Sequence, residues 1–133
     1  MPEMTAVPSI VTGYAGVLGL MWIVLFFLAG RHRGGPDGVS IGDGGKVELI
    51  VAMRRHANFV ESVPLTLLLL ALLEMNDVSG TAIHGLGSAL VVFRACHAYG
   101  FRADESKKLF RALGAGGTTL VIAISSIWAI TLF

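Results

Sequence analysis

The sequence predicts an all-α membrane protein, a bundle of four transmembrane helices, on three observations. Of its 133 residues, 54% are hydrophobic and only 14% are charged, whereas a soluble domain has about 25% charged residues. The mean hydropathy is +0.74, and a soluble domain of this size would expose too much surface to hide so much apolar area. Four apolar stretches each reach the roughly 20 helical residues that cross a hydrocarbon core. The chain therefore belongs in a lipid bilayer.

The four expected helices form one domain over residues 1–133 and cover about residues 8–29, 47–73, 81–101 and 109–133. The first is too long for a cleaved signal peptide and has no basic segment before it, so we expect it to be retained. Pro64 predicts a kink in the second. Ser79 or Thr81 is suited to cap the third, and Asp104 with Ser106 to start the fourth.

The linkers have the composition of loops, and glycines recur inside the helices. Residues 30–46 are rich in Gly, Pro and Asp, which break helices, and the turns at 74–80 and 102–108 are short. Small residues let membrane helices approach closely. The glycines to which we assign this role are Gly13, Gly16, Gly19, Gly114, Gly116 and Gly117.

Charge placement predicts the orientation of the chain in the membrane. All ten Lys and Arg residues lie in the first linker, the third linker or the adjoining helix halves. Lys and Arg favour the cytoplasmic side. We therefore expect the first and third linkers to be cytoplasmic and both termini to lie outside.

A polar stripe runs along the second expected helix. Arg54, Asn58 and Glu61 are spaced i, i+4, i+7 and fall within an arc of roughly 60°. Because an intramembrane charge costs about 2.5 to 3.5 kcal/mol, the stripe must face the bundle interior, a water-filled cavity or a partner. One interpretation is an interior Arg54–Glu61 ion pair with Asn58 linking helices; the other is a binding site.

The third expected helix carries a second stripe near the same end. Arg94, His97 and Phe101 are spaced i, i+3, i+7, with Tyr99 close by. Arg94 is suited to a carboxylate and His97 to hydrogen bonding. Alternatively, Arg94 extends to the interface and His97 is a satisfied core histidine. Two stripes at one end of the bundle favour a site.

Several other chemistries have little support. His56 and Glu61 lie about 140° apart on a helix, and His84 is near the other membrane face, so we expect no metal site. The H-E-x-x-H, G-x-S-x-G and phosphate-loop patterns are missing from the sequence. The single cysteine, Cys96, excludes an intrachain disulfide and should be inert in apolar surroundings. A net charge of +1 provides no basic field for nucleic acid.

The run RRHANFVESVP at residues 54–64 closely resembles the signature of the MAPEG family, the membrane-associated proteins in eicosanoid and glutathione metabolism. That signature is R-x-x-x-N-x-x-E followed by Pro. The matching residues are Arg54, Asn58, Glu61 and Pro64, with His56 where members often carry His. The run RACHAYGF at 94–101 is similar to the family's R-x-x-H/Y-x-x-x-aromatic pattern, and Arg111 followed by Gly114 resembles the start of its fourth helix.

The resemblance implies a homotrimer of left-handed four-helix bundles, with glutathione as co-substrate between neighbouring subunits near the cytoplasmic face. In that arrangement Arg54 and Arg94 would hold carboxylates, Asn58 would bind the peptide, Glu61 would meet the amine or brace Arg54, and His56, His97 and Tyr99 would add contacts. The short loops look most like those of prokaryotic members, which implies the plasma (inner) membrane.

The same resemblance implies a catalytic cation near the start of the fourth helix, either Arg111 or Lys108. A nearby cation stabilises thiolate over thiol, lowering a pKa that starts near 8.5, and the thiolate is the nucleophile. The second substrate, a lipophilic electrophile or hydroperoxide, would arrive from the bilayer beside Trp22, Phe26 and Phe27. Ser62 and Phe101 stand where relatives often carry Tyr, so two hydroxyls are lost.

The predicted function is therefore that of a membrane glutathione transferase or peroxidase. Its expected partners are membrane lipid, a lipophilic substrate and other copies of the chain, with no nucleic acid. The alternative is a non-catalytic protein of the same fold that binds lipid or glutathione, because family membership does not guarantee catalysis. A small transporter subunit has little support, because no span is broken at mid-depth by Gly or Pro.

Overall fold

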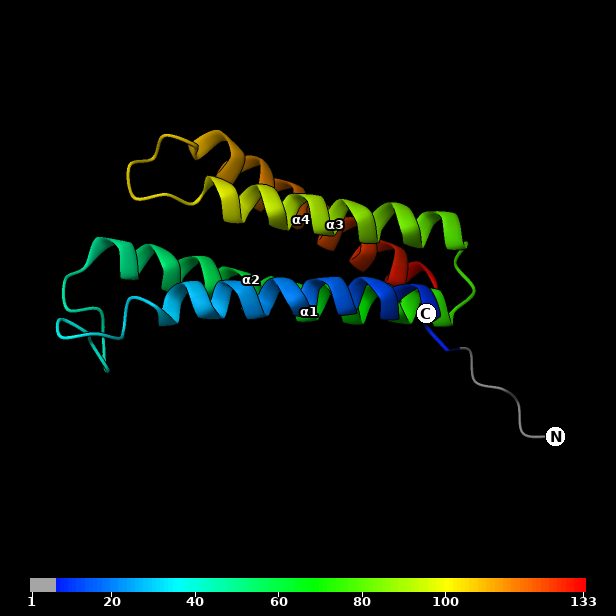
Figure 1. Ribbon diagram of the computed structural model, residues 1–133. Helices are drawn as coiled ribbons and strands as arrows, with labels where there is room; N and C mark the ends of the chain where they lie inside the picture. Colours follow the sequence, from blue (N-terminus) through cyan, green and yellow to red (C-terminus); the bar gives the residue numbers. More distant parts are fainter. Residues whose placement is uncertain (1–6) are drawn as a thin grey trace.

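The computed structural model describes residues 7–133, which form four antiparallel helices. They are α1 (Ser9–Gly30), α2 (Val47–Met75), α3 (Gly80–Gly100) and α4 (Lys108–Thr131). The loops at 31–46 and 101–107 lie at one end, and the turn at 76–79 lies at the other with the C-terminus (Figure 1). The all-helical prediction is confirmed, and each helix begins and ends within two residues of its expected bounds.

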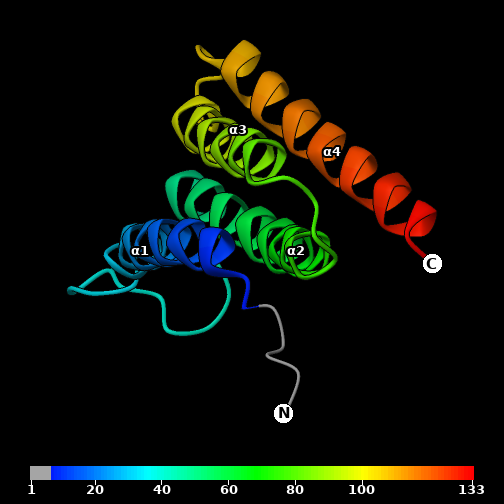
Figure 2. The same ribbon diagram turned by 90° about the vertical axis from the view of Figure 1, so that its right-hand side faces the viewer.

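Three of the four helices, α1, α2 and α4, are long and apolar enough to cross a membrane. The 21-residue α3 is not among them, and its polar residues His84, Arg94 and His97 lower its hydropathy. Composition therefore supports three of the four expected spans. The α3 helix nevertheless lies along α4 and over α2, as both views show (Figure 1 and Figure 2).

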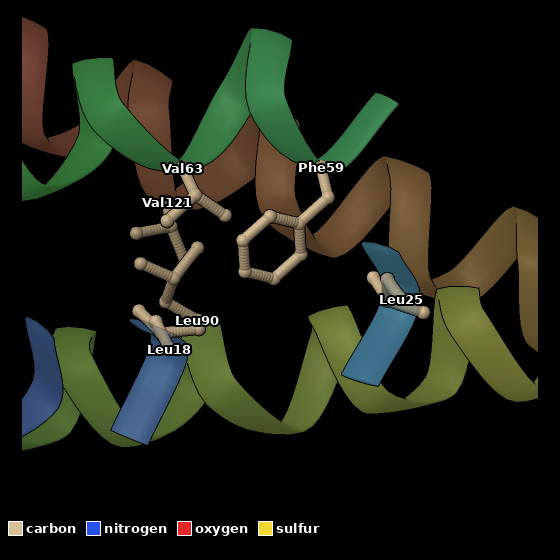
Figure 3. Close-up of a cluster of buried hydrophobic side chains, with 6 residues drawn as sticks. All are labelled: Leu18, Leu25, Phe59, Val63, Leu90 and Val121. Atoms are coloured by element: carbon tan, nitrogen blue, oxygen red, sulfur yellow. The ribbon is translucent and has the colours of Figure 1, made fainter. Parts of the chain in front are cut away.

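All four helices contribute to the apolar core. One buried cluster consists of Leu18 and Leu25 from α1, Phe59 and Val63 from α2, Leu90 from α3 and Val121 from α4; these side chains converge between the helices (Figure 3). A second cluster, nearer the 76–79 turn, consists of Val11, Leu70, Leu73 and Ile83. The outer surface is also apolar, with large side chains exposed on every helix, among them Leu20, Phe27, Leu68, Val92, Leu120 and Ile127. A helix that is apolar all round is typical of a membrane span.

Glycines bring α3 and α4 into backbone contact. A Cβ added at Gly114 would collide with the backbone of Phe93 and His97, and one at Gly100 would collide with the backbone of α4's first turn. Gly117 lies against the ring of Phe93. The packing role is thus confirmed for Gly114 and Gly117. For Gly13, Gly16, Gly19 and Gly116 it is wrong within residues 7–133 of one chain, where nothing lies within 4 Å of an added Cβ.

At the other end, Glu74 of α2 caps α1. Its carboxylate oxygens accept hydrogen bonds from the backbone N–H groups of Ile10 (2.8 Å) and Val11 (2.9 Å). The first N–H groups of a helix have no partner inside the helix, and a negative charge there is favourable. Pro8, the residue before the helix, makes no capping hydrogen bond with its own side chain. Glu74 therefore supplies the cap of α1.

The remaining local predictions have mixed outcomes. Ser79 caps α3 by accepting from the N–H of Ala82 (3.3 Å), as expected. Asp104 and Ser106 instead form a turn before α4, which begins only at Lys108 and has no side-chain cap. The α2 helix continues through Pro64.

We predict that Gly114→Ala lowers the unfolding temperature in detergent, whereas Gly116→Ala does not. The added methyl at Gly114 meets the backbone of α3, and overpacking of this kind costs about 1 to 3 kcal/mol. At Gly116 the methyl meets open space, and alanine is the better helix former. Equal unfolding temperatures for the two variants would contradict the close α3–α4 contact.

Candidate functional site

The centre of the polar region is the guanidinium of Arg94, which is 2% exposed and lies where α2, α3 and α4 meet. Its Nε donates to Thr118 Oγ1 (2.8 Å), and its Nη2 donates to the carbonyl oxygen of Gly114 (3.0 Å). Its Nη1 donates to Asn58 Oδ1 (2.7 Å) and to Ser62 Oγ (3.3 Å). These four acceptors are all neutral. Four of the five guanidinium N–H groups are thus used inside the protein, and one N–H of Nη2 remains.

Two of these partners, Thr118 and Ser62, were not predicted from the sequence. Thr118 belongs to the buried stripe of α4, which consists of Gly114, Thr118, Val121 and Ser125. The spacing i, i+4, i+7, i+11 is that of one helix face. Small and polar residues at this spacing would have allowed the sequence to predict that Thr118 faces the interior. Ser62 was considered above only because it lacks the hydroxyl group of a Tyr. Its own hydroxyl donates a hydrogen bond to the carbonyl oxygen of Asn58 (2.8 Å).

His97 and Arg111 are brought together by Phe101. His97 is buried, and its ring centroid lies 5.4 Å from that of Phe101. The guanidinium carbon of Arg111, in the first turn of α4, lies 5.0 Å from the centroid of the same ring. A cation over an aromatic face is favourable. Phe101 therefore has a positioning role although it lacks the hydroxyl of Tyr.

Tyr99 and Lys108 lie on the outside. The Tyr99 ring is 48% exposed and packs edge-on against Phe110, at 5.2 Å between centroids. Arg102 places its guanidinium carbon 4.8 Å from the Tyr99 ring centroid. Lys108 is the exposed first residue of α4. The structure therefore does not bring Tyr99 or Lys108 into contact with Arg94.

Arg54 and Glu61 are both exposed, whereas Asn58 between them is half-buried. Within residues 7–133 the structure forms no Arg54–Glu61 ion pair, so the interior-pair interpretation is wrong for the single chain. The reason is the rotation of α2, which turns Phe59 and Val63 toward the core. Asn58 alone reaches the interior, where it links α2 to α3 as that interpretation expected.

His56 faces α1 rather than the Arg94 cluster. Its ring centroid lies 5.2 Å from that of Trp22 and 6.1 Å from that of Phe26. Its Nε2 atom is buried and has no hydrogen-bond partner among the described residues. A polar atom in this condition beside aromatic rings is a place where a ligand group can bind.

Residues 7–133 contain no group of three His, Cys, Asp or Glu side chains placed to hold a metal ion. Cys96 is a free, half-buried thiol.

The four helices and the loops between them fall within one match to a known protein family. The MAPEG family model matches residues 11–131. The chain belongs to the MAPEG family. This MAPEG protein is 34% identical over 95 residues to the inner membrane protein YecN of Escherichia coli K12, covering 68% of the chain and 70% of YecN. YecN of Escherichia coli O6:H1 strain CFT073 matches to the same extent. No solved structure matches. The protein is thus a multi-pass membrane protein of this family.

We predict that Arg94→Met lowers the free energy of unfolding by about 3 kcal/mol, because it leaves buried acceptors of this MAPEG protein without a donor. Arg54→Met is the control, since Arg54 is exposed and a surface substitution usually changes stability by no more than about 0.5 kcal/mol. Unfolding in detergent measures both. If the two variants unfold alike, Arg94 does not hold the three helices together.

Proposed function

We propose that this protein is an integral membrane glutathione-dependent transferase or peroxidase that acts on lipophilic electrophiles or hydroperoxides. The observation that carries the proposal is the pair Arg54 and Glu61, exposed on α2 on either side of Asn58. A membrane helix keeps exposed charges only where a partner or ligand compensates them. In the family arrangement that compensation comes from glutathione and from the neighbouring subunit of a homotrimer.

The charges of glutathione complement this face of α2. The tripeptide carries two carboxylates and one amine, so it needs cations and an acid. Arg54 would hold a carboxylate, Glu61 would meet the amine or brace Arg54, and Asn58 would bind the peptide. Arg94 has one N–H left for the second carboxylate, and His56, His97 and Tyr99 would complete the contacts from either subunit.

Arg111 is the proposed thiolate-stabilising residue, with Lys108 as the alternative. Arg111 is supported by its half-buried position on Phe101 beside His97, whereas Lys108 is exposed. A cation in partly apolar surroundings favours the thiolate more strongly than one in water. The thiolate then attacks the lipophilic substrate.

The lipophilic substrate would enter from the bilayer along α1. Trp22, Phe26 and Phe27 are exposed there by 38%, 48% and 66%. The proposed topology follows the cations: the loops at 31–46 and 101–107 are cytoplasmic, both termini lie outside, and the membrane is the plasma (inner) membrane. We also propose that α3 crosses the membrane, because its Arg94 is buried by α2 and α4 and does not face lipid.

A non-catalytic binding protein is the second candidate. Arg94 already donates to four protein acceptors, and Ser62 and Phe101 provide no tyrosine hydroxyl. These observations favour a site that binds glutathione or lipid without activating a thiol. Thiolate formation separates the two candidates.

We predict that glutathione bound to the purified protein at pH 7 shows thiolate absorbance and that Arg111→Ala abolishes it. The reason is the loss of the cation that stabilises the thiolate. Lys108→Ala is the matched variant and should retain the signal. No thiolate in the wild type at saturating glutathione would favour the binding protein, and loss only in Lys108→Ala would move the role to Lys108.

We predict that Arg54→Ala weakens glutathione binding about tenfold or more, because a hydrogen bond to a charged group contributes about 1.5 to 3 kcal/mol. Calorimetric titration of the protein in detergent measures the change. Lys107→Ala removes a cation of the 101–107 loop and should leave the affinity unchanged. An unchanged affinity in Arg54→Ala would exclude the outer face of α2 as the glutathione site.

A further inference from the structure

A second cationic site lies between the two loops, away from the outer face of α2. It is a cavity of about 350 Å³ that is lined by residues from both loops and from α2, at the end of the bundle that carries both loops (Figure 1). Four of the residues that line it carry or can carry positive charge, and these are Arg31, His32, Arg55 and Arg102. They come from the ends of α1 and α3 and from the first half of α2. The cavity therefore lies at the ends of the helices, among cations that we expect at the cytoplasmic membrane surface.

Arg55 is the innermost of these cations, and it is only partly satisfied. Its Nη2 donates to the carbonyl oxygen of Phe101, which ties α2 to the end of α3. Its Nε is buried and has no hydrogen-bond partner among the described residues. A buried donor without an acceptor destabilises the folded protein. Because Arg55 lines the cavity, an anion there would compensate the positive charge of its guanidinium.

Arg102 has free donors beside the same cavity. Its Nε donates to the carbonyl oxygen of Tyr99 (3.1 Å), which leaves both Nη groups for a ligand. Arg31 immediately follows α1 and also lines the cavity. Three guanidinium groups in this arrangement provide the planar, forked donors that suit phosphate oxygens.

Two carboxylates also line the cavity, and they neutralise the arginines only in part. Ser106 donates its backbone N–H (3.0 Å) and its hydroxyl (2.8 Å) to Asp104 Oδ1. These bonds, with the charge of Arg102, hold the pKa of the Asp104 carboxyl below its usual value. Glu48 is exposed at the mouth. With both acids ionised, three arginines still leave a net charge of +1.

A shallow apolar groove on the surface of α1 alone continues from this cavity. It is lined by Ile23, Val24, Phe27, Leu28, Gly30 and Arg31. Leu28 and Arg31 line both the groove and the cationic cavity. A ligand that occupies both needs an anionic head and a hydrocarbon tail, which a soluble phosphate does not have.

We propose that the loop cavity binds the phosphate of an anionic phospholipid, with an acyl chain of that lipid lying in the groove on α1. Basic pockets between membrane helices are a known way of holding such head groups. The site differs in place and in residues from the proposed glutathione site, and it does not depend on glutathione chemistry.

The test compares lipid binding to the full chain by native mass spectrometry and by thermal stabilisation in detergent. The probes are phosphatidylglycerol and the zwitterionic phosphatidylcholine. We expect the wild type to prefer phosphatidylglycerol and Arg102→Gln to weaken that binding about tenfold, the effect of one charged hydrogen bond. Arg55→Gln should do the same. Lys107→Gln removes a cation of the same loop that does not line the cavity and should bind like the wild type.

Four results would overturn the proposal. The first is equal binding of the two lipids by the wild type. The second is unchanged phosphatidylglycerol binding in Arg102→Gln. Because Arg102 is exposed, this variant provides the test even if Arg55→Gln fails to fold. The third is protection by glycerol phosphate equal to that by phosphatidylglycerol, which would mean that the ligand is a soluble phosphate. The fourth is displacement of the lipid by glutathione, which would mean that the cavity belongs to the glutathione site.

Discussion

The buried guanidinium of Arg94 is the interaction on which the rest of the structure depends. A charge inside a membrane bundle is tolerated only when its donors are satisfied. Four acceptors on α2 and α4 meet this need: two side chains of α2, one side chain of α4 and one carbonyl oxygen of α4. The carbonyl belongs to Gly114, the residue whose missing side chain also lets α3 and α4 touch. Gly114 thus contributes both to the close packing of α3 on α4 and to the burial of the Arg94 charge.

The sequence predicted the helices well because their apolar runs have the length of a bilayer crossing. The sequence also singled out Asn58 and Arg94 as polar residues that must avoid lipid, since each lies in an apolar run. The hydrogen bond between them did not follow from the sequence, because it depends on how α2 and α3 are rotated. A helix that is apolar all round has no hydrophobic face to set that rotation. For this reason the polar stripe of α2, Arg54, Asn58 and Glu61, was expected to face a single environment.

The division of that stripe has a geometric cause. At 100° per residue, Asn58 lies roughly 40° from Arg54 and 60° from Glu61, on the side toward Ser62 and Phe59. The core side of α2 is centred near Phe59, Val63 and Thr66. Asn58 therefore falls at the margin of the interior while the two charged residues point outward. The chain thus satisfies the guanidinium of Arg94 with its own acceptors, whereas in the proposed function the two outward charges of α2 are met by a ligand or a neighbouring subunit.

The bond between Glu74 and the start of α1 has a consequence for the long loop at 31–46. Glu74 of α2 accepts hydrogen bonds from two backbone N–H groups of α1. The axial register of α1 against α2 is therefore set at the end of the hairpin far from that loop. Residues added to or removed from the loop tip would leave the level of Trp22 relative to His56 unchanged. The tip of the loop, beyond the Arg31 and His32 that line the cavity, is therefore able to change in length and sequence while the helices stay in place.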